Sequence, residues 1–167
     1  MWDSLTKVLS VEGAPEPYAF EEPLALRLFK GSARLAAVSG KDVIRQYPVT
    51  IGRPDSPTPS GQYQVELRVN EPVSETKLFG TRALSFAKGQ FAIHGTNDPA
   101  SIGEPFSNGC VRLTNEDAEE LFALTPLGTA IDITDAVSPH PDRPAGTRFE
   151  SPPREDEASK RTYRWRG

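Results

Sequence analysis

The chain has 167 residues, enough to bury a hydrophobic core in one domain without disulfides or a structural metal. Its net charge of -4 argues against a nucleic-acid-binding surface as the main function, and its single cysteine excludes an internal disulfide. No stretch approaches the roughly 18 consecutive apolar residues of a membrane span, so no transmembrane segment is expected.

Residues 1–23 mix proline, glutamate and isolated apolar side chains, which predicts a loosely attached N-terminal arm. The segment has neither a basic start nor a long apolar stretch, so it does not resemble a signal peptide. If the chain is complete, we expect a cytoplasmic protein. If a signal peptide has been removed ahead of Met1, we expect the cell envelope or periplasm.

From Leu24 the sequence takes on the alternation that is typical of strands. Apolar residues at every second position over 24–29, a turn at 30–32 and a further apolar run at 35–38 predict a hairpin. Another strand is predicted at 43–51. Residues 52–61 contain three prolines and two glycines, so they are predicted to form a loop.

The clearest strand pattern covers residues 62–69, where apolar and polar side chains alternate strictly. It predicts a single half-buried strand. Residues 70–88 show no regular pattern. A loop of this length is often functional, so they are interpreted as a lid or substrate-contacting flap; the alternative is a surface excursion anchored by Leu78 and Phe79.

The next predicted elements surround the lone cysteine. Residues 91–94 form a short apolar strand that ends at His94, and 111–113 form a strand fragment. Thr114, with Asp117 three positions later, predicts the start of a helix over 114–124, and a final strand is predicted at 130–133. Residues 136–167 are rich in proline and charge, which predicts a disordered or docking tail.

Cys110 and His94 are the candidates for covalent chemistry. A single cysteine is usually a small buried hydrophobe, and a single histidine is usually a satisfied core residue. A free thiol titrates at about 8.5 and needs a base to become a nucleophile at neutral pH, a role that His94 can fill. Gly109 has no side chain, so the backbone amides beside it can approach a substrate carbonyl.

These residues sit in a longer pattern that resembles the catalytic domain of the L,D-transpeptidase (YkuD) family. The pattern consists of Thr58-Pro59-Ser60-Gly61 after Gly52, then His94-Gly95-Thr96, then Ser107-Asn108-Gly109-Cys110-Val111-Arg112-Leu113, and finally Asn115 and Asp117. One departure is visible, since the family usually has histidine where this chain has Asn108.

The resemblance implies a mainly β fold: a mixed sheet or sandwich around the cysteine site, with one short helix after the Cys110 strand. This agrees with the strands and the helix predicted above. The expected organisation is an N-terminal arm (1–23), a catalytic domain (24–135) and a tail (136–167).

The resemblance also implies roles for the residues around Cys110. The thiol is the nucleophile, His94 is the general base and acid, and a carbonyl just after the histidine, at Gly95 or Thr96, orients its ring. Gly109 is expected to supply a backbone oxyanion donor.

Four side chains are expected to contact substrate: Thr96, Ser107, Asn108 and Arg112. Arg112 has two possible roles, because its guanidinium can bind a substrate carboxylate or brace the loop that carries Ser107 and Asn108. Bracing is slightly favoured.

The implied substrate is a peptidoglycan stem tetrapeptide or muropeptide, and the implied reaction releases the terminal D-alanine and forms an L,D cross-link. Two alternatives remain open: an L,D-carboxypeptidase that uses water as acceptor, and an inactive cell-wall binding module. No cofactor is expected. A metal site is disfavoured because His140 lies in the tail and no CxxC or HExxH spacing is present.

Overall fold

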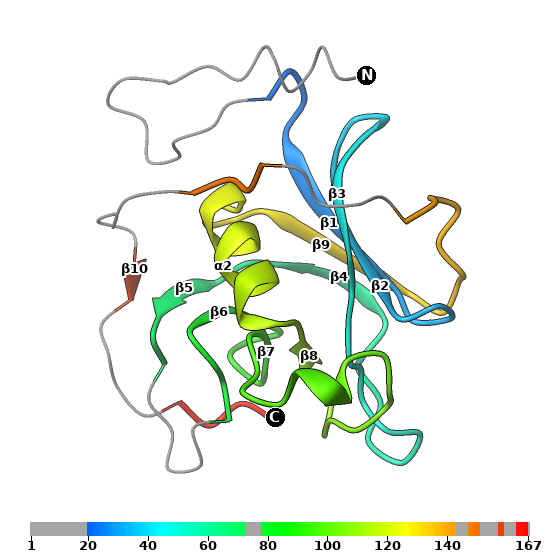
Figure 1. Cartoon of the computed structure of the whole chain (residues 1–167), viewed down its shortest axis with the longest axis vertical. Coiled ribbons are helices and arrows are strands. Elements are labelled where there is room, and N and C mark those ends of the chain that lie inside the picture. The colour runs from blue at the N-terminus through cyan, green and yellow to red at the C-terminus, as the bar shows by residue number, and fades with distance from the viewer. Residues whose placement is uncertain (1–19, 73–77, 143–146, 151–156, 159–162, 167) are drawn as a thin grey trace.

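A computed structural model describes residues 20–72, 78–142, 147–150, 157–158 and 163–166 (Figure 1). The predicted N-terminal arm therefore lies outside the described residues up to residue 19. The strands are β1 (Leu24–Phe29), β2 (Arg34–Ser39), β3 (Asp42–Pro48), β4 (Gly61–Gln64), β5 (Leu67–Asn70), β6 (Arg82–Phe86), β7 (Phe91–His94), β8 (Val111–Arg112), β9 (Ala130–Thr134) and β10 (Glu157–Ala158). The helical elements are a short 3-10 helix, η1 (Pro99–Ser101), and the α-helix α2 (Asn115–Leu124).

The first sheet has the strand order β3-β2-β1-β9-β4. The alternating segments predicted as a hairpin form β1 and β2, which pair antiparallel. The other edge of β1 pairs in parallel with β9, so that Leu26 lies opposite Ile131 in the core. This sheet is therefore mixed.

The second sheet has the order β10-β5-β6-β7-β8 and lies below the first in the view of Figure 1. Its strands β7 and β8 pair in parallel, with Ile93 opposite Val111 and His94 opposite Arg112. The strands predicted on either side of Cys110 are thus confirmed, and they are direct neighbours. Two mixed sheets and one short helix confirm the expected mainly β fold class.

The single strand predicted at 62–69 is in fact two strands in different sheets. Val65 N–H donates to Thr129 O at 2.9 Å, beside the β4 and β9 pair, whereas Glu66 N–H donates to Ser85 O at 2.8 Å, beside the β5 and β6 pair. The chain thus passes from one sheet to the other between these two residues. The alternation of side chains continues through the crossing, so periodicity alone gave no sign of it.

Arg68 differs from its predicted place on the wet face of this strand, because its side chain is fully buried. Its Nη1 donates to Phe122 O at 2.5 Å and to Thr125 O at 2.6 Å, and its guanidinium stacks over the Phe122 ring at 4.0 Å. These carbonyls lie at the C-terminal end of α2, where intrahelical donors run out. Arg68 therefore caps α2 and ties it to the second sheet.

The start of α2 confirms the helix predicted at 114–124. Thr114 is the N-cap, and its side chain accepts from Asp117 N–H at 3.1 Å. Leu121 and Phe122 are buried, and the helix packs against β6 and β7 of the second sheet. The helix therefore begins shortly after β8, the strand that follows Cys110, and its first turn is fixed by the Thr114 cap.

The region 70–88, predicted as an irregular lid or flap, contains the buried strand β6, which pairs with β5 on one side and β7 on the other. Four of its five residues are buried, so both faces are covered and no alternation appears in the sequence. The interpretation as one long flap is therefore wrong for residues 82–86. Residues 73–77 lie outside the described residues.

The described parts of 136–166 pack against the domain, as the docking alternative for the predicted tail expects and the disordered alternative does not. The Arg34 guanidinium binds the Asp142 carboxylate at 3.0 Å, and Phe149 N–H donates to the buried Glu120 carboxylate at 3.0 Å. Strand β10 pairs with β5, and Tyr163 and Trp165 are buried in the core cluster. Across the described residues, no helix has the length and apolar character needed to cross a membrane.

Candidate active site

His94 is the last residue of β7, and its side chain is fully buried. Its Nδ1 lies 2.5 Å from the Gly95 carbonyl oxygen. Because a carbonyl only accepts, Nδ1 must carry the proton, and Nε2 keeps its lone pair. The residues that the structure describes offer no hydrogen-bond partner to Nε2. This is the contact that the sequence resemblance implies for Gly95, and it leaves the other ring nitrogen available as a base.

Cys110 directly precedes β8 and shares a face of the second sheet with His94. Residues opposite each other in a pair point to the same face, as do alternate residues along one strand. Since His94 lies opposite Arg112, the side chains of His94, Cys110 and Arg112 all project on one side. The fully buried thiol accepts a hydrogen bond from Ala92 N–H at 3.2 Å.

Burial sets the charge state of both groups. It lowers the pKa of His94 to about 4, an effect opposed by the Gly95 hydrogen bond and reinforced by the charge of Arg112. Burial also raises the pKa of the Cys110 thiol to about 12, against the opposing effects of the Ala92 hydrogen bond and Arg112. At neutral pH the structure therefore holds both the imidazole of His94 and the thiol of Cys110 in their neutral forms.

The loop that carries Cys110 is braced from inside by buried hydroxyl groups. The Ser107 hydroxyl donates to Cys110 O at 2.6 Å and accepts from Gly109 N–H at 3.0 Å. From the 52–61 loop, the Thr58 hydroxyl donates to Gly109 O at 2.8 Å and accepts from Gly52 N–H at 2.9 Å. Ser107 and Thr58 therefore fix the backbone on both sides of the peptide bond that precedes the thiol.

Gly109 has φ +130°, a conformation that side-chain-bearing residues rarely adopt, and a Cβ there would collide with the Phe91 ring. Its N–H donates to Ser107, so in this structure it is engaged within the loop. The role of Gly109 as an oxyanion donor stays a prediction. The amide of Cys110 donates outside the loop instead, to Arg166 O at 2.9 Å.

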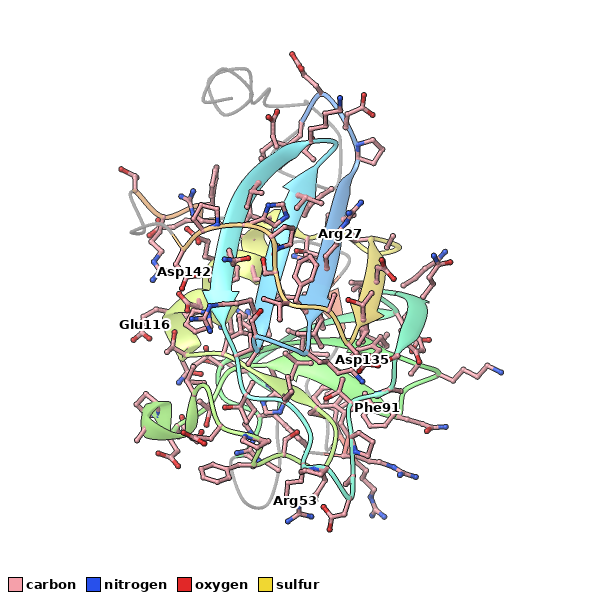
Figure 2. The ribbon with its side chains drawn as sticks, turned by 90° about the vertical axis from the view of Figure 1, so that its right-hand side faces the viewer. Arg27, Arg53, Phe91, Glu116, Asp135 and Asp142 are labelled. Atoms are coloured by element: carbon pink, nitrogen blue, oxygen red, sulfur yellow. The ribbon has the colours of Figure 1, made fainter. Side chains whose placement is uncertain are left out.

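Three predicted substrate contacts occupy different environments. Ser107 is fully buried and acts within the loop. Thr96 is also buried, and its hydroxyl accepts from Asp98 N–H at 3.0 Å. Asn108 is exposed, with Oδ1 2.5 Å from Nη2 of Arg53, which reaches the surface in Figure 2. Of these three, only Asn108 is exposed at the rim of the site.

Arg112 is the remaining predicted contact, and its guanidinium is partly exposed beside the thiol. Its backbone pairs with Thr50 in both directions at 2.9 Å, so the backbone of Arg112 is fixed. The guanidinium makes no hydrogen bond or ion pair to any described residue, and its buried Nε has no partner among them. Among the described residues, the guanidinium thus has no bracing hydrogen bond of the kind that the sequence interpretation slightly favoured. Burial lowers the pKa of Arg112, whereas the charge of Asp98 is close enough to raise it, although Asp98 forms no ion pair with the guanidinium.

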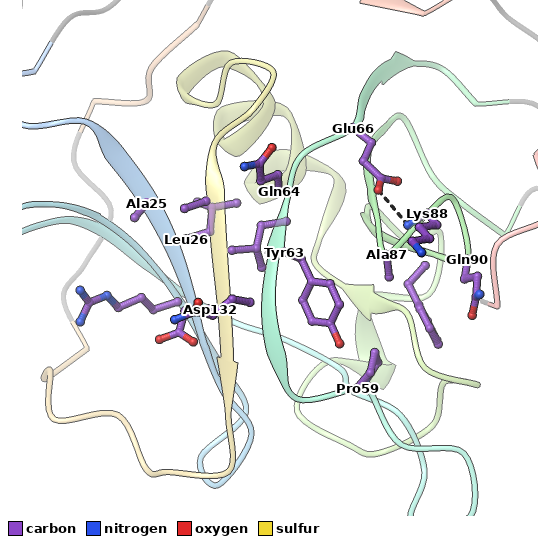
Figure 3. A pocket seen from close by; sticks show the side chains of 15 residues that line it. Ala25, Leu26, Pro59, Tyr63, Gln64, Glu66, Ala87, Lys88, Gln90 and Asp132 are labelled. Atoms are coloured by element: carbon purple, nitrogen blue, oxygen red, sulfur yellow. Dashed lines mark hydrogen bonds between the residues drawn. The ribbon is translucent and has the colours of Figure 1, made fainter.

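A groove of about 980 Å³ is lined by residues of both sheets (Figure 3), among them Phe91, whose ring lies against Gly109. Tyr63 and Pro59 form part of one wall, and the turn at 87–90 forms another. The Glu66 carboxylate fixes this turn by accepting from Lys88 N–H at 2.8 Å. Pro59 of the predicted 52–61 loop is thus part of the lining of this groove.

Two aromatic contacts to the site were missed by sequence reasoning. Phe79 packs edge-on against the His94 ring with centroids 5.1 Å apart, and Trp165 packs edge-on against Phe79 at 4.8 Å. The alternation of Tyr163 and Trp165 with arginines was an available strand-like signal in the tail. Within the described ranges, no group of three or more histidine, cysteine or acidic side chains is arranged to hold a metal.

Comparisons with known proteins show the family of this chain. A family model described as the L,D-transpeptidase catalytic domain (YkuD) matches residues 28–133. The putative L,D-transpeptidase YkuD of Bacillus subtilis is 35% identical over 123 residues, covering 74% of this chain and 72% of that protein.

Solved structures share the fold. An L,D-transpeptidase from Stackebrandtia nassauensis aligns with a TM-score of 0.60 and 19% identity over 80% of this chain and 61% of that one. L,D-transpeptidase 3 from Mycobacterium tuberculosis, in complex with a faropenem-derived adduct, aligns with a TM-score of 0.60 and 18% identity. That alignment covers 66% of this chain and 59% of the other, so this chain spans about three fifths of either solved chain.

Proposed function

This chain belongs to the YkuD family of L,D-transpeptidase catalytic domains, and we propose that it is a cysteine acyltransferase acting on peptidoglycan stem peptides. The proposal is carried by one observation. His94 and Cys110 project from neighbouring parallel strands onto one face, and the Gly95 carbonyl holds His94 in the tautomer whose Nε2 can accept a proton. An imidazole fixed in this way beside a thiol is the arrangement that activates a cysteine nucleophile.

In the first half of the proposed reaction, the Cys110 sulfur attacks the carbonyl carbon of the diamino-acid residue that precedes the terminal D-alanine. Nε2 of His94 takes the thiol proton as the C–S bond forms. The tetrahedral oxyanion is stabilised by the Cys110 N–H, the amide that donates out of the loop. The C–N bond then breaks, D-alanine leaves with the proton returned by His94, and a thioester remains.

In the second half, an amine of a neighbouring stem attacks the thioester carbonyl and loses a proton to His94. The C–S bond breaks, Cys110 recovers its proton, and the new amide is the L,D cross-link. The neutral state of both groups suits this sequence, since burial disfavours a preformed ion pair and proton transfer accompanies attack. With water in place of the amine, the same steps yield a shortened stem.

Arg112 is assigned the substrate carboxylate. Its guanidinium lies beside the thiol and makes no ion pair to a described residue, and a planar guanidinium binds a carboxylate through two parallel hydrogen bonds. The terminal D-alanine of a stem tetrapeptide carries such a carboxylate next to the bond that breaks. Asn108 is hydrogen-bonded to Arg53 and stands where the family usually has histidine. Its amide places a side chain that does not titrate at the rim of the site.

The proposal is tested by incubating the purified protein with a disaccharide tetrapeptide and separating the products by mass. Release of D-alanine together with a cross-linked dimer is the expected result. Tripeptide without dimer would identify water as the acceptor and overturn cross-linking. A parallel incubation with faropenem is expected to add one acyl group to the wild type and none to Cys110→Ser. No adduct on the wild type and no consumption of tetrapeptide would favour an inactive binding module.

A further inference from the structure

Residues 163–166 lie against the loop that carries Cys110, far from it in sequence but adjacent in the fold (Figure 1). Arg166 N–H donates to Gln90 O at 3.1 Å, and Arg166 O accepts from Cys110 N–H at 2.9 Å. Both backbone groups of Arg166 are therefore paired, each with a different segment of the domain.

This pairing fills a gap in the second sheet. Strands β7 and β8 pair directly from Ile93 and Val111 onward. Before that point, Arg166 bridges Gln90 and Cys110 through its own backbone. A site of this kind accepts an extended peptide by main-chain hydrogen bonds, as in β-strand addition. The backbone of Arg166 thus occupies a strip between Gln90 and Cys110, next to the thiol.

Aromatic packing holds the segment in place on the side of His94. Trp165 packs against Phe79, which in turn packs against the His94 ring. Tyr163 stacks on Trp165 with centroids 4.5 Å apart and an interplanar angle of 12°. Both rings are only 7% exposed, whereas Arg164 between them is exposed, so the segment has one buried and one solvent face.

The hydrogen bond from the Cys110 N–H to Arg166 O involves an amide that can take part in acyl transfer. An acyl group on the sulfur brings its carbonyl oxygen within reach of the backbone N–H of the same residue, which is why that amide serves as an oxyanion donor in acyl-transfer enzymes. We propose that residues 163–166 are a built-in pseudosubstrate, with Arg166 O bound to the Cys110 N–H where the scissile carbonyl oxygen of a stem peptide binds. The acyl-donor site is then the strip between Gln90 O, Cys110 N–H and the Phe79 ring.

The side chains of the segment fit the same interpretation. The exposed Arg166 guanidinium lies 5.9 Å from the centroid of the Phe91 ring, and a glycine follows it in the sequence. The proposed substrate has a diamino acid, with an amine on its side chain, followed by the small residue alanine. A cationic residue followed by a small one is thus common to both. This likeness to the stem peptide rests on the proposed function, whereas the shielding of Cys110 by residues 163–166 does not.

Alkylation of the single cysteine by iodoacetamide, followed by intact mass, tests the covering directly. Trp165→Ala removes the ring that anchors the segment, and Arg166→Pro removes the N–H that pairs with Gln90. Each is expected to raise the alkylation rate at least tenfold. Arg164→Ala, on the solvent face, is the matched control and is expected to stay within twofold of the wild type. Wild-type rates in both folded test variants would overturn the proposal.

Hydrogen exchange on the unaltered chain gives a second readout that does not depend on the variants folding. The Arg166 amide is hydrogen-bonded to Gln90, whereas the Arg164 amide makes no hydrogen bond to a described residue. We expect Arg166 to exchange at least a hundredfold more slowly than Arg164, after correction for intrinsic rates. Equal exchange at the two amides would show that the segment is not seated and would overturn the proposal.

Stem-peptide kinetics separate this proposal from the proposed function. If residues 163–166 compete with the acyl donor, Trp165→Ala lowers KM for the tetrapeptide and leaves kcat unchanged. If Trp165→Ala is alkylated faster but does not react with tetrapeptide, residues 163–166 do shield Cys110. That result would nevertheless overturn both the pseudosubstrate identity and the transpeptidase proposal. If Trp165→Ala turns over tetrapeptide with the alkylation rate and the KM of the wild type, the transpeptidase proposal stands and the pseudosubstrate proposal is overturned.

Discussion

The imidazole of His94 donates from Nδ1 to the carbonyl oxygen of the next residue, Gly95, across 2.5 Å. This backbone contact fixes the tautomer without a carboxylate partner. Gly95 is held in turn, since its N–H donates to Arg82 O at 3.1 Å and the Asn115 side chain at the start of α2 packs against it while accepting from Thr81 N–H at 3.1 Å. The orientation of the base is thus part of the fold.

The lowered pKa of His94 predicts a loss of stability in acid. Its pKa falls from 6.5 to about 4 on folding, so the folded state favours the neutral ring. The resulting stabilisation is complete above pH 6.5 and is lost as the pH falls toward 4. A shift of this size corresponds to roughly 3 kcal/mol of unfolding free energy.

Urea denaturation at pH 7 and at pH 4.5 measures this loss, with His94→Gln as the control because glutamine does not titrate. The variant is expected to be less sensitive than the wild type to this pH change. The same pH sensitivity in both proteins would show that His94 is not buried in its neutral form.

Arg112→Gln separates substrate binding from bracing. Because the guanidinium makes no hydrogen bond or ion pair to a described residue, we expect little change in the melting temperature. Loss of a charge-assisted carboxylate contact is expected to raise KM for the tetrapeptide by about 10- to 100-fold. The KM of Arg112→Lys should lie between those of the wild type and Arg112→Gln. A lower melting temperature with unchanged KM would instead support the bracing role.

Ser107→Ala removes a buried hydroxyl that bridges Cys110 O and Gly109 N–H. Leaving these groups without a partner should cost about 1–3 kcal/mol of stability. The loosened loop should also lower kcat for acylation, with KM little changed. Ser56→Ala is the matched control, since its hydroxyl donates to Asn108 O at an exposed position and should matter little. Equal effects of the two substitutions would contradict the bracing role of Ser107.

Gly109→Ala tests the close packing behind the nucleophile. Gly128 also has a positive φ, +81°, but a Cβ there would meet nothing within 4 Å. Both alanine variants introduce backbone strain, and only Gly109→Ala also collides with the Phe91 ring. We therefore expect Gly109→Ala to lose about 1–3 kcal/mol more in denaturant unfolding. Equal losses would mean that the Phe91 ring can move aside.

Much of the fold could be predicted because its signals are local. Thr114 with Asp117 marked the helix start, and the apolar run ending at His94 marked β7. The failures came from contacts that no local pattern records. The alternation over 62–69 is the same whether one strand forms or two, and β6 is buried on both faces, so it shows no period.

The site shows the same division. The family resemblance implied that a carbonyl at Gly95 or Thr96 orients His94, and the structure has the contact at Gly95. The roles of Cys110 as nucleophile and His94 as base stay predictions. The amide that donates out of the loop and its partner Arg166 were not predicted, since a hydrogen bond between distant backbone groups leaves no trace in residue type. Composition therefore suggested a solvated tail at residues that lie beside the nucleophile.

The most direct test is the intact mass of the protein after mixing with disaccharide tetrapeptide and rapid acid quenching, measured for the wild type, Trp165→Ala and Cys110→Ser. We expect an adduct of the stem peptide lacking its terminal D-alanine, localised to the peptide that contains Cys110. The adduct should accumulate faster in Trp165→Ala and should be absent in Cys110→Ser. No adduct in either of the first two proteins, or an adduct that persists in Cys110→Ser, would contradict the assignment of Cys110 as the acyl-accepting nucleophile.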